Sequence, residues 1–389
     1  MLSVTREKGV ILRNKDDKEE NHNYVPDDLS GYKHLYAGDF VINKMKSWQG
    51  SYGVSEYEGI VSPAYFTCKL RGVDPQFFSR AIRSKAYIGF FMQFSKGIRV
   101  DQWDLDPSSM KDIPFVLPPF EEQKRIVSYL NDAIAKIDEA IAQQQRLVDL
   151  FNERRHIIIN QAVTKGLNPN AKMKESGIEW IGEMPAHWDI KRLKHLAKVF
   201  GRIGFRGYNA SDLVDEEEGA ITLSPSNMKE QGMQYNNCTY LSWNKYYESP
   251  EIMINDGDVL FVKTGSTYGK SCFVEDLPLE ATINPQLVVF KEFNCDNRFF
   301  AYLLQSNIVR NQVEISVIGG TIPTISQNKI LNYIVPIPSL EEQSLIVEEI
   351  IRRCKPIDEA ISYTNKMITL LQERKQIIVK EVVTGKVKI

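Results

Sequence analysis

Two glycine-bearing loops carry the side chains best suited to contact a nucleic acid. Lysine ammonium groups can neutralise phosphates, and amide or hydroxyl groups can read base edges. Glycines allow close backbone approach. Either loop alone could be an ordinary polar hairpin, but the same kind of loop occurs in both halves of the chain, which favours a binding role. The candidate contacts are Lys44, Lys46, Trp48, Gln49, Ser51 and Tyr52 in the first loop, and Lys263, Thr264, Ser266, Tyr268 and Lys270 in the second.

A second pair of candidate strips lies just ahead of two long helical segments. The first strip holds Lys96 and Arg99, and the second holds Thr321 and Thr324. Residues 40–100 contain nine Lys or Arg against three acids, although the net charge of −2 does not by itself indicate a nucleic-acid binder.

Signals for catalysis are weak. The stretch from Thr264 to Ser271 resembles a phosphate-binding loop but is one residue short between its glycines. The histidines are scattered, and the five cysteines show no metal-ligand spacing. We therefore expect no catalytic residue, no metal site and no cofactor in this chain. A nucleotide hydrolase that uses the Gly265–Ser271 loop stays open as an alternative.

An internal repeat organises the chain. Residues 118–164 align without a gap to 338–384, and 18 of the 47 pairs are identical. Each copy places apolar residues in steps of three, four and seven, which predicts one long helix with a single apolar stripe. We expect the two helices to pair as a two-stranded coiled coil, with separate docking of each helix as the alternative. The predicted pairing residues are Ile126, Leu130, Ile137, Ile141, Ile346, Ile350, Ile357 and Ile361.

Local signals refine the second helix. Ser339 and Glu342 have the spacing of a capping box at its start. Pro356 removes a backbone hydrogen bond, so we expect a kink or an interruption there.

The segments before the helices echo each other more weakly and predict two α+β globules. Tyr52-Gly53 corresponds to Tyr268-Gly269, and Ser62-Pro63 to Asn284-Pro285. Amphipathic helices are expected around Phe77 and Phe299. We therefore divide the chain into a globule, a central helical spacer, a second globule and a C-terminal helical spacer, at residues 1–113, 114–166, 167–333 and 334–389. The first globule lacks a counterpart of residues 177–200, so we expect it to be shortened at its N-terminus by a strand or two, through a late start codon or a truncation.

The sequence shows no signal-peptide pattern and no apolar run of about 20 residues, which a membrane span requires. We therefore expect a cytoplasmic protein that does not associate with a membrane.

The chain resembles the specificity subunit of Type I restriction–modification systems. The resemblance rests on VLPPFEEQKRIVSYL and PIPSLEEQSLIVEEI, on the duplicated IDEAI, and on GIEWIGEMPAHWDIKRLKHLAKV, which is similar to the opening of a target-recognition domain. It implies two target-recognition domains, each reading half of a bipartite site on double-stranded DNA, separated by the two antiparallel helices. It also implies two methylation subunits that use S-adenosylmethionine and two restriction subunits that use ATP and Mg²⁺.

Three rival readings remain open beside this resemblance. The chain could be a non-catalytic coiled-coil scaffold without a DNA role, the nucleotide hydrolase described above, or a specificity subunit that pairs with a second copy of itself.

Overall fold

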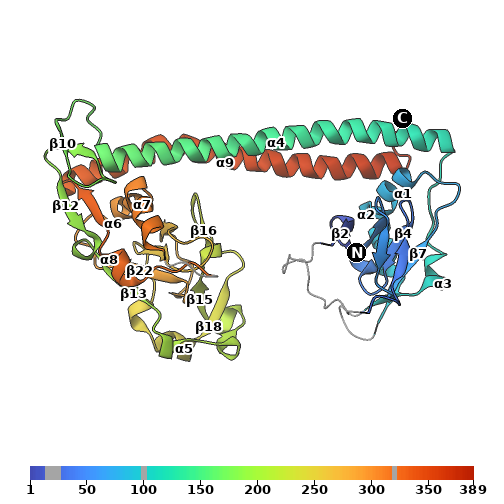
Figure 1. Ribbon diagram of the computed structural model, residues 1–389, viewed down its shortest axis with the longest axis horizontal. Helices are drawn as coiled ribbons and strands as arrows, with labels where there is room; N and C mark the ends of the chain where they lie inside the picture. Colours follow the sequence, from blue (N-terminus) through green and yellow to red (C-terminus); the bar gives the residue numbers. More distant parts are fainter. Residues whose placement is uncertain (14–27, 98–102, 318–321) are drawn as a thin grey trace. The chain divides into compact units, whose positions relative to one another are not determined.

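The computed structural model describes residues 1–13, 28–97, 103–317 and 322–389. The predicted contacts Arg99 and Thr321 lie outside these residues. The chain forms two compact units, each containing one globule and part of each long helix (Figure 1). Unit 1 comprises Met1–Gln145 with Asn365–Ile389, and unit 2 comprises Arg146–Thr364. The four-part division of the sequence stays a prediction.

Unit 1 combines short antiparallel sheets with helices packed against them. In its three-stranded sheet, β4 lies between β5 and β7, while β1 pairs with β2, β3 with β6 and β8 with β9. The strands are β1 (Leu2–Thr5), β2 (Gly9–Leu12), β3 (Lys33–Leu35), β4 (Phe40–Asn43), β5 (Tyr52–Val54), β6 (Gly59–Val61), β7 (Tyr65–Cys68), β8 (Ser95–Lys96) and β9 (Asp104–Leu105). The helices of the globule are α1 (Pro75–Ile82), α2 (Lys85–Gln93) and α3 (Pro107–Met110).

Unit 2 contains two four-stranded sheets. One has the order β13-β22-β19-β20 and is antiparallel, and the other has the order β14-β18-β15-β21, in which β15 and β21 run parallel. The smaller sheets pair β10 with β11, β12 with β23 and β16 with β17. The strands are β10 (Met173–Glu175), β11 (Glu183–Pro185), β12 (Asp189–Arg192), β13 (Lys198–Gly201), β14 (Leu213–Val214), β15 (Gly219–Leu223), β16 (Met228–Lys229), β17 (Gly232–Met233), β18 (Thr239–Ser242), β19 (Val259–Val262), β20 (Ser271–Phe273), β21 (Ala281–Ile283), β22 (Leu287–Lys291) and β23 (Ile334–Ile337). Its short helices are α5 (Trp243–Tyr247), α6 (Asn297–Leu304), α7 (Asn307–Ser316) and α8 (Gln327–Leu331). This mixture confirms the predicted α+β class.

The three-stranded sheet of unit 1 corresponds to β20-β19-β22 of unit 2. The strand β13, which extends the sheet of unit 2 beyond β22, has no counterpart among the described residues of unit 1. Its first three residues end the segment 177–200, for which the first half of the sequence offers no match.

The amphipathic helices expected around Phe77 and Phe299 are confirmed as α1 and α6. Each begins at an aspartate whose carboxylate accepts a backbone hydrogen bond, from Phe77 N to Asp74 at 2.9 Å and from Phe299 N to Asp296 at 2.8 Å. Such N-caps satisfy donors that the first helical turn leaves free. Both phenylalanines are fully buried, so the caps fix which face of each helix enters the core.

The two long helices are confirmed as α4 (Phe120–Lys165) and α9 (Leu340–Val383), of 46 and 44 residues. Of the eight predicted pairing residues, Ile141 is half-buried and the other seven are buried. The helix α9 continues through Pro356, so the predicted interruption is wrong. Cys354 and Ile357 are buried on either side of the proline, and their packing supports the turn that lacks a backbone hydrogen bond.

The helices pair in an antiparallel sense within each unit. In unit 1, Ile126 and Leu130 near the start of α4 share a buried cluster with Val382 near the end of α9. Lys375 also contacts Asp138, at 2.6 Å.

In unit 2, Arg155 of α4 pairs with Asp358 of α9 at 3.1 Å. Gly166, just beyond α4, lies beside Glu342 in the first turn of α9. The predicted mutual pairing of the helices is therefore confirmed inside both units.

Equivalent glutamines of the two repeats, Gln123 and Gln343, join each globule to a long helix through hydrogen bonds. The side-chain oxygen of Gln123 accepts from Asp74 N at 2.7 Å, and its amide donates to Pro118 O at 2.8 Å. Gln343 repeats both contacts with Asp296 N and Pro338 O, at 2.8 and 2.9 Å. Both side chains are buried. The repeated Glu-Glu-Gln therefore joins the start of a spacer helix to the cap of a globule helix.

The predicted capping box at Ser339 forms only in part. The Ser339 hydroxyl accepts from Glu342 N at 3.3 Å. The Glu342 carboxylate instead accepts from Trp188 Nε1 and contacts His187 Nε2, at 3.1 and 2.9 Å. The Glu342 side chain is therefore engaged in tertiary contacts with His187 and Trp188, whereas a complete capping box would require it to bond to the backbone of Ser339.

Candidate nucleic-acid interface

The second glycine-bearing loop is a hairpin loop, at residues 263–270, that joins β19 to β20. Val262 N donates to Lys270 O and Gly269 N donates to Val262 O, both at 2.8 Å, which closes the base of the loop. Gly269 has a φ of 83°, and a Cβ there would lie 2.8 Å from Val313 of α7. A side chain at this position would therefore meet both backbone strain and a packed neighbour.

The structure brings the two predicted strips of unit 2 together. Thr264 of the hairpin and Thr324 of the segment before α8 form an antiparallel β-bridge. Ile325 N also donates to Lys263 O at 2.8 Å. Thr324 and Ser266 are exposed, and Lys263 is half-buried. Burial lowers the pKa of the Lys263 ammonium, which makes it a partly desolvated cation at the base of the loop.

Unit 1 repeats this arrangement. Leu105 N donates to Lys44 O at 3.0 Å, as Ile325 N does to Lys263 O. The Lys44 ammonium lies 3.2 Å from the Asp104 carboxylate, so part of its charge is compensated. Lys46 and Lys96 are exposed. In unit 1 the loop is therefore bonded to β9, which pairs with the β8 residue Lys96 of the predicted strip, and in unit 2 it is bonded directly beside Thr324.

Burial changes the set of candidate contacts in the first loop. Tyr52 is fully buried and stacks on Phe91 with 4.1 Å between ring centroids, and its burial raises the pKa of its phenol. Ser51 is only 2% exposed. These two predicted contacts are wrong for the structure as it stands, because neither side chain reaches solvent. Trp48, beside Trp103, and Gln49 are half-buried and keep part of their surface available.

The strand register corrects one pairing drawn from the sequence. Ile42 of β4 faces Tyr52, and Phe261 of β19 faces Ser271. Because β4 and β19 are equivalent strands, Tyr52 corresponds to Ser271 and not to Tyr268. Tyr268 instead donates from its hydroxyl to Glu314 at 3.0 Å.

The loop from Gly265 to Ser271 is not a phosphate-binding loop. In a nucleotide-binding loop of this pattern, the lysine and hydroxyl residue open a helix, whose N-terminus receives the phosphates. Here Ser271 begins β20, and the loop joins two antiparallel strands. The nucleotide-hydrolase alternative is therefore wrong.

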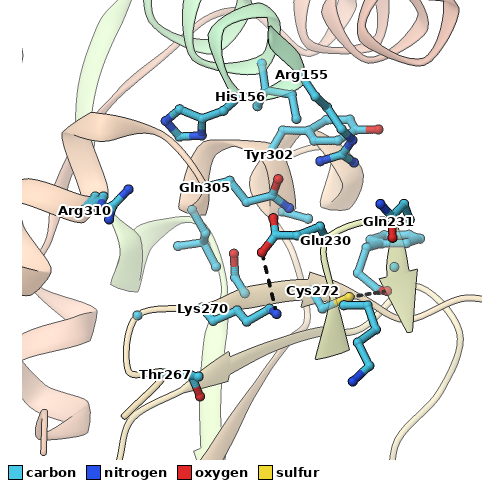
Figure 2. Close-up of a pocket in the computed structure, with 18 of the residues that line it drawn as sticks. Arg155, His156, Glu230, Gln231, Thr267, Lys270, Cys272, Tyr302, Gln305 and Arg310 are labelled. Atoms are coloured by element: carbon cyan, nitrogen blue, oxygen red, sulfur yellow. Dashed lines mark hydrogen bonds and ion pairs between the residues drawn. The ribbon is translucent and has the colours of Figure 1, made fainter. Parts of the chain in front are cut away.

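A polar cleft of about 500 Å³ lies behind this hairpin in unit 2 (Figure 2). Its walls come from the hairpin, the β16–β17 turn, α6, α7 and the α4 residues Arg155 and His156. Its cations are largely compensated, since Lys270 faces Glu230 at 3.7 Å and Arg155 faces Asp358. Within the described parts of the chain, no group of three or more His, Cys, Asp or Glu side chains could hold a metal ion. The cleft links the hairpin to the spacer helix and offers no assembled catalytic group.

Sequence reasoning missed two polar side chains beside the hairpin, Asn284 and Gln286. Lys263 N donates to Gln286 O at 2.9 Å, so this turn is bonded directly to the start of the loop. The only signal in the sequence was the recurrence of Ser62-Pro63 as Asn284-Pro285, which marked a repeat without indicating a site.

Among the described residues, no helix is both long and apolar enough to cross a membrane.

Comparisons with known proteins agree with this architecture. Residues 185–368 match the family model described as the Type I restriction modification DNA specificity domain. The type I restriction enzyme MjaVIII specificity subunit of Methanocaldococcus jannaschii is 25% identical over 290 residues, which are 73% of this chain and 64% of that protein. The putative type I restriction enzyme MjaX specificity subunit of the same organism is 25% identical over 381 residues, which are 94% of this chain and 83% of that protein.

A solved structure reported as "Structural basis underlying complex assembly and conformational transition of the type I R-M system" shares the fold. Its TM-score is 0.60 at 15% sequence identity, over 92% of this chain and 84% of that chain. The duplicated architecture, the matched DNA specificity domain and the two curated relatives agree with one another. Residues 185–368 are therefore similar to the DNA specificity domain of type I restriction–modification systems, and the chain as a whole is similar to the specificity subunits of such systems.

Proposed function

We propose that this chain reads a bipartite target on double-stranded DNA, with one half-site contacted by each unit. The observation that carries the proposal is the recurrence, in both units, of a lysine-bearing hairpin whose first lysine accepts a backbone hydrogen bond from the segment ahead of the long helix. Two modest half-site contacts on one chain give a tight combined site, because the second contact is intramolecular. The candidate contacts that remain available are Lys44, Lys46, Trp48, Gln49, Lys96, Lys263, Thr264, Ser266, Tyr268, Lys270 and Thr324.

The long helices also supply a surface for partner subunits. In unit 2, α4 exposes apolar side chains at Leu147, Leu150 and Ile157, of which Leu150 is 54% exposed, and α9 exposes Leu345 and Ile351. Clustered exposed apolar side chains are typical of protein–protein interfaces. We propose that the assembled complex contains two methylation subunits and two restriction subunits and works in the cytoplasm. The methylation subunits would carry S-adenosylmethionine, and the restriction subunits would use ATP and Mg²⁺.

Mapping methylated bases in a genome that carries the complete system tests the bipartite target. We expect an adenine-methylation motif interrupted by a stretch of unspecified bases. A continuous motif, or no motif despite a functional methylation partner, would contradict the proposal that each unit contacts one half-site.

Charge reversal distinguishes a DNA reader from a scaffold. The variant Lys46→Glu/Lys263→Glu, assembled with its partners, is expected to lose DNA affinity, because phosphate contacts depend on these cations. The control Lys366→Glu changes an exposed lysine on α9. Equal affinity of the wild type and the double variant would favour the scaffold.

A further inference from the structure

A turn of two amide side chains lies at the base of the unit 2 hairpin. The Asn284 carboxamide oxygen accepts from Gln286 N at 3.0 Å, and the Asn284 amide donates to the side-chain oxygen of Gln286 at 3.1 Å. The backbone of Gln286 is held again by Lys263 N, at 2.9 Å. The Gln286 side chain is exposed. It is therefore an outward-facing amide with one defined orientation.

The hairpin backbone approaches this amide closely on one side. Gly265 has a φ of 107°, and a Cβ there would come within 3.3 Å of the Gln286 amide nitrogen. With its oxygen engaged once by Asn284, the Gln286 amide keeps two donors and a second acceptor lone pair. A glutamine amide with one donor and one acceptor free can bond simultaneously to N6 and N7 of adenine in the major groove. Fixing it beforehand reduces the ordering cost of binding.

Unit 1 contains the same turn with a different residue at its tip. The Ser62 hydroxyl accepts from Ala64 N at 3.3 Å, and Tyr65 N donates to Ser62 O at 3.0 Å, as Leu287 N does to Asn284 O at 3.2 Å. The register agrees, since Asn43 faces Tyr65 and Val262 faces Leu287. The position of Gln286 is therefore occupied by Ala64 in unit 1. The backbone scaffold is kept, while the group that could read a base is present in one unit and absent from the other.

We propose that Gln286 is a specificity-determining residue that reads an adenine in the half-site of unit 2, and that Asn284 is the positioning residue that orients its amide. This inference rests on the proposed DNA-reading function. It also assigns a difference between the two half-sites to one pair of equivalent positions, Gln286 and Ala64.

The test compares methylation motifs and DNA affinities of the full complex containing the wild type or one of two variants. Gln286→Ala is expected to leave the spacer and the unit 1 half-site unchanged, while preference at one adenine of the other half-site falls on the order of 10- to 100-fold. Asn284→Ser keeps a turn acceptor like that of Ser62 but removes the donor that orients Gln286. It is expected to relax the same position by a smaller factor.

The controls separate a reading role from a structural one. Gln234→Ala removes another exposed glutamine side chain of unit 2 and should leave the motif unchanged. Circular dichroism and recovery of the assembled complex establish that each variant folds. Uniformly weaker binding without a change at one base would show that Gln286 only stabilises the turn and would overturn the inference.

The outcomes also separate this inference from the proposed function. An interrupted wild-type motif that persists unchanged in Gln286→Ala refutes the reading role alone. The absence of an interrupted motif in the wild type refutes the proposed function, and the role of Gln286 with it.

Discussion

Replacement of Gln343 by alanine should weaken the attachment of the unit 2 globule to its long helix. The Gln343 amide joins Asp296 N to Pro338 O, and the side chain is 2% exposed. Each hydrogen bond contributes about 1 kcal/mol net, and a stranded buried polar group costs about 1–3 kcal/mol. We therefore expect the free energy of unfolding of unit 2 to fall by about 3–5 kcal/mol when the two lost hydrogen bonds and one stranded polar group are taken together.

Native-state hydrogen exchange is the appropriate assay, because a chain with two units need not unfold in a single transition. Exchange of the backbone amides in α6 should accelerate in Gln343→Ala, since its N-cap residue Asp296 loses a partner. Gln123→Ala provides the matched test in unit 1, where α1 should respond in the same way. Glu348→Ala changes an exposed residue of α9 and should alter stability by less than about 0.5 kcal/mol. If Gln343→Ala were no more destabilising than Glu348→Ala, the proposed attachment would be refuted.

Three further predictions concern the core, the charge and the thiols. Leu130→Ala should destabilise unit 1 by about 2–5 kcal/mol in urea unfolding, because Leu130 is fully buried; an unchanged midpoint would contradict that packing. Lys263→Ala should reduce the slope of log affinity against log salt by about 0.9 for the assembled complex on DNA, without changing the recognised motif; an unchanged slope would exclude a phosphate contact. Burial raises the pKa of the Cys272 and Cys295 thiols to about 12, so little thiolate exists at neutral pH. Mass spectrometry should therefore show slow alkylation of both in the native protein and rapid alkylation in urea, with the larger difference at the buried Cys272. Equal rates at Cys272 would contradict its burial.

The long helices were predictable because their signal is local and repeated. The recurring apolar stripe needs only the helical period to be recognised. The eight predicted pairing residues are buried where the pattern places them, apart from the half-buried Ile141. Pro356 shows the limit of such local rules. The proline lowers the preference for a helix at its own position, but the packing of Cys354 and Ile357 supports the helix across it.

The candidate site was predictable in place but only partly in detail. The sequence located both hairpins and both strips ahead of the helices. It could not separate Lys46, which is exposed, from Tyr52, which stacks on Phe91 from a helix 39 positions later. It also aligned Tyr52 with Tyr268 on residue type, whereas the strand register assigns Ser271 to that position.

The sequence by itself determined the duplication, the helical spacers and the α+β character of the globules, because periodicity and repeated motifs express these properties over short distances. Only the tertiary structure decided which loop side chains reach solvent and which residues meet across the fold. The Gln343 side chain accepts from Asp296 N, which lies 47 positions away in the sequence. The Gln286 carbonyl accepts from Lys263 N, which lies 23 positions away. Such contacts depend on how strands and helices pack, and no local pattern of residues encodes them.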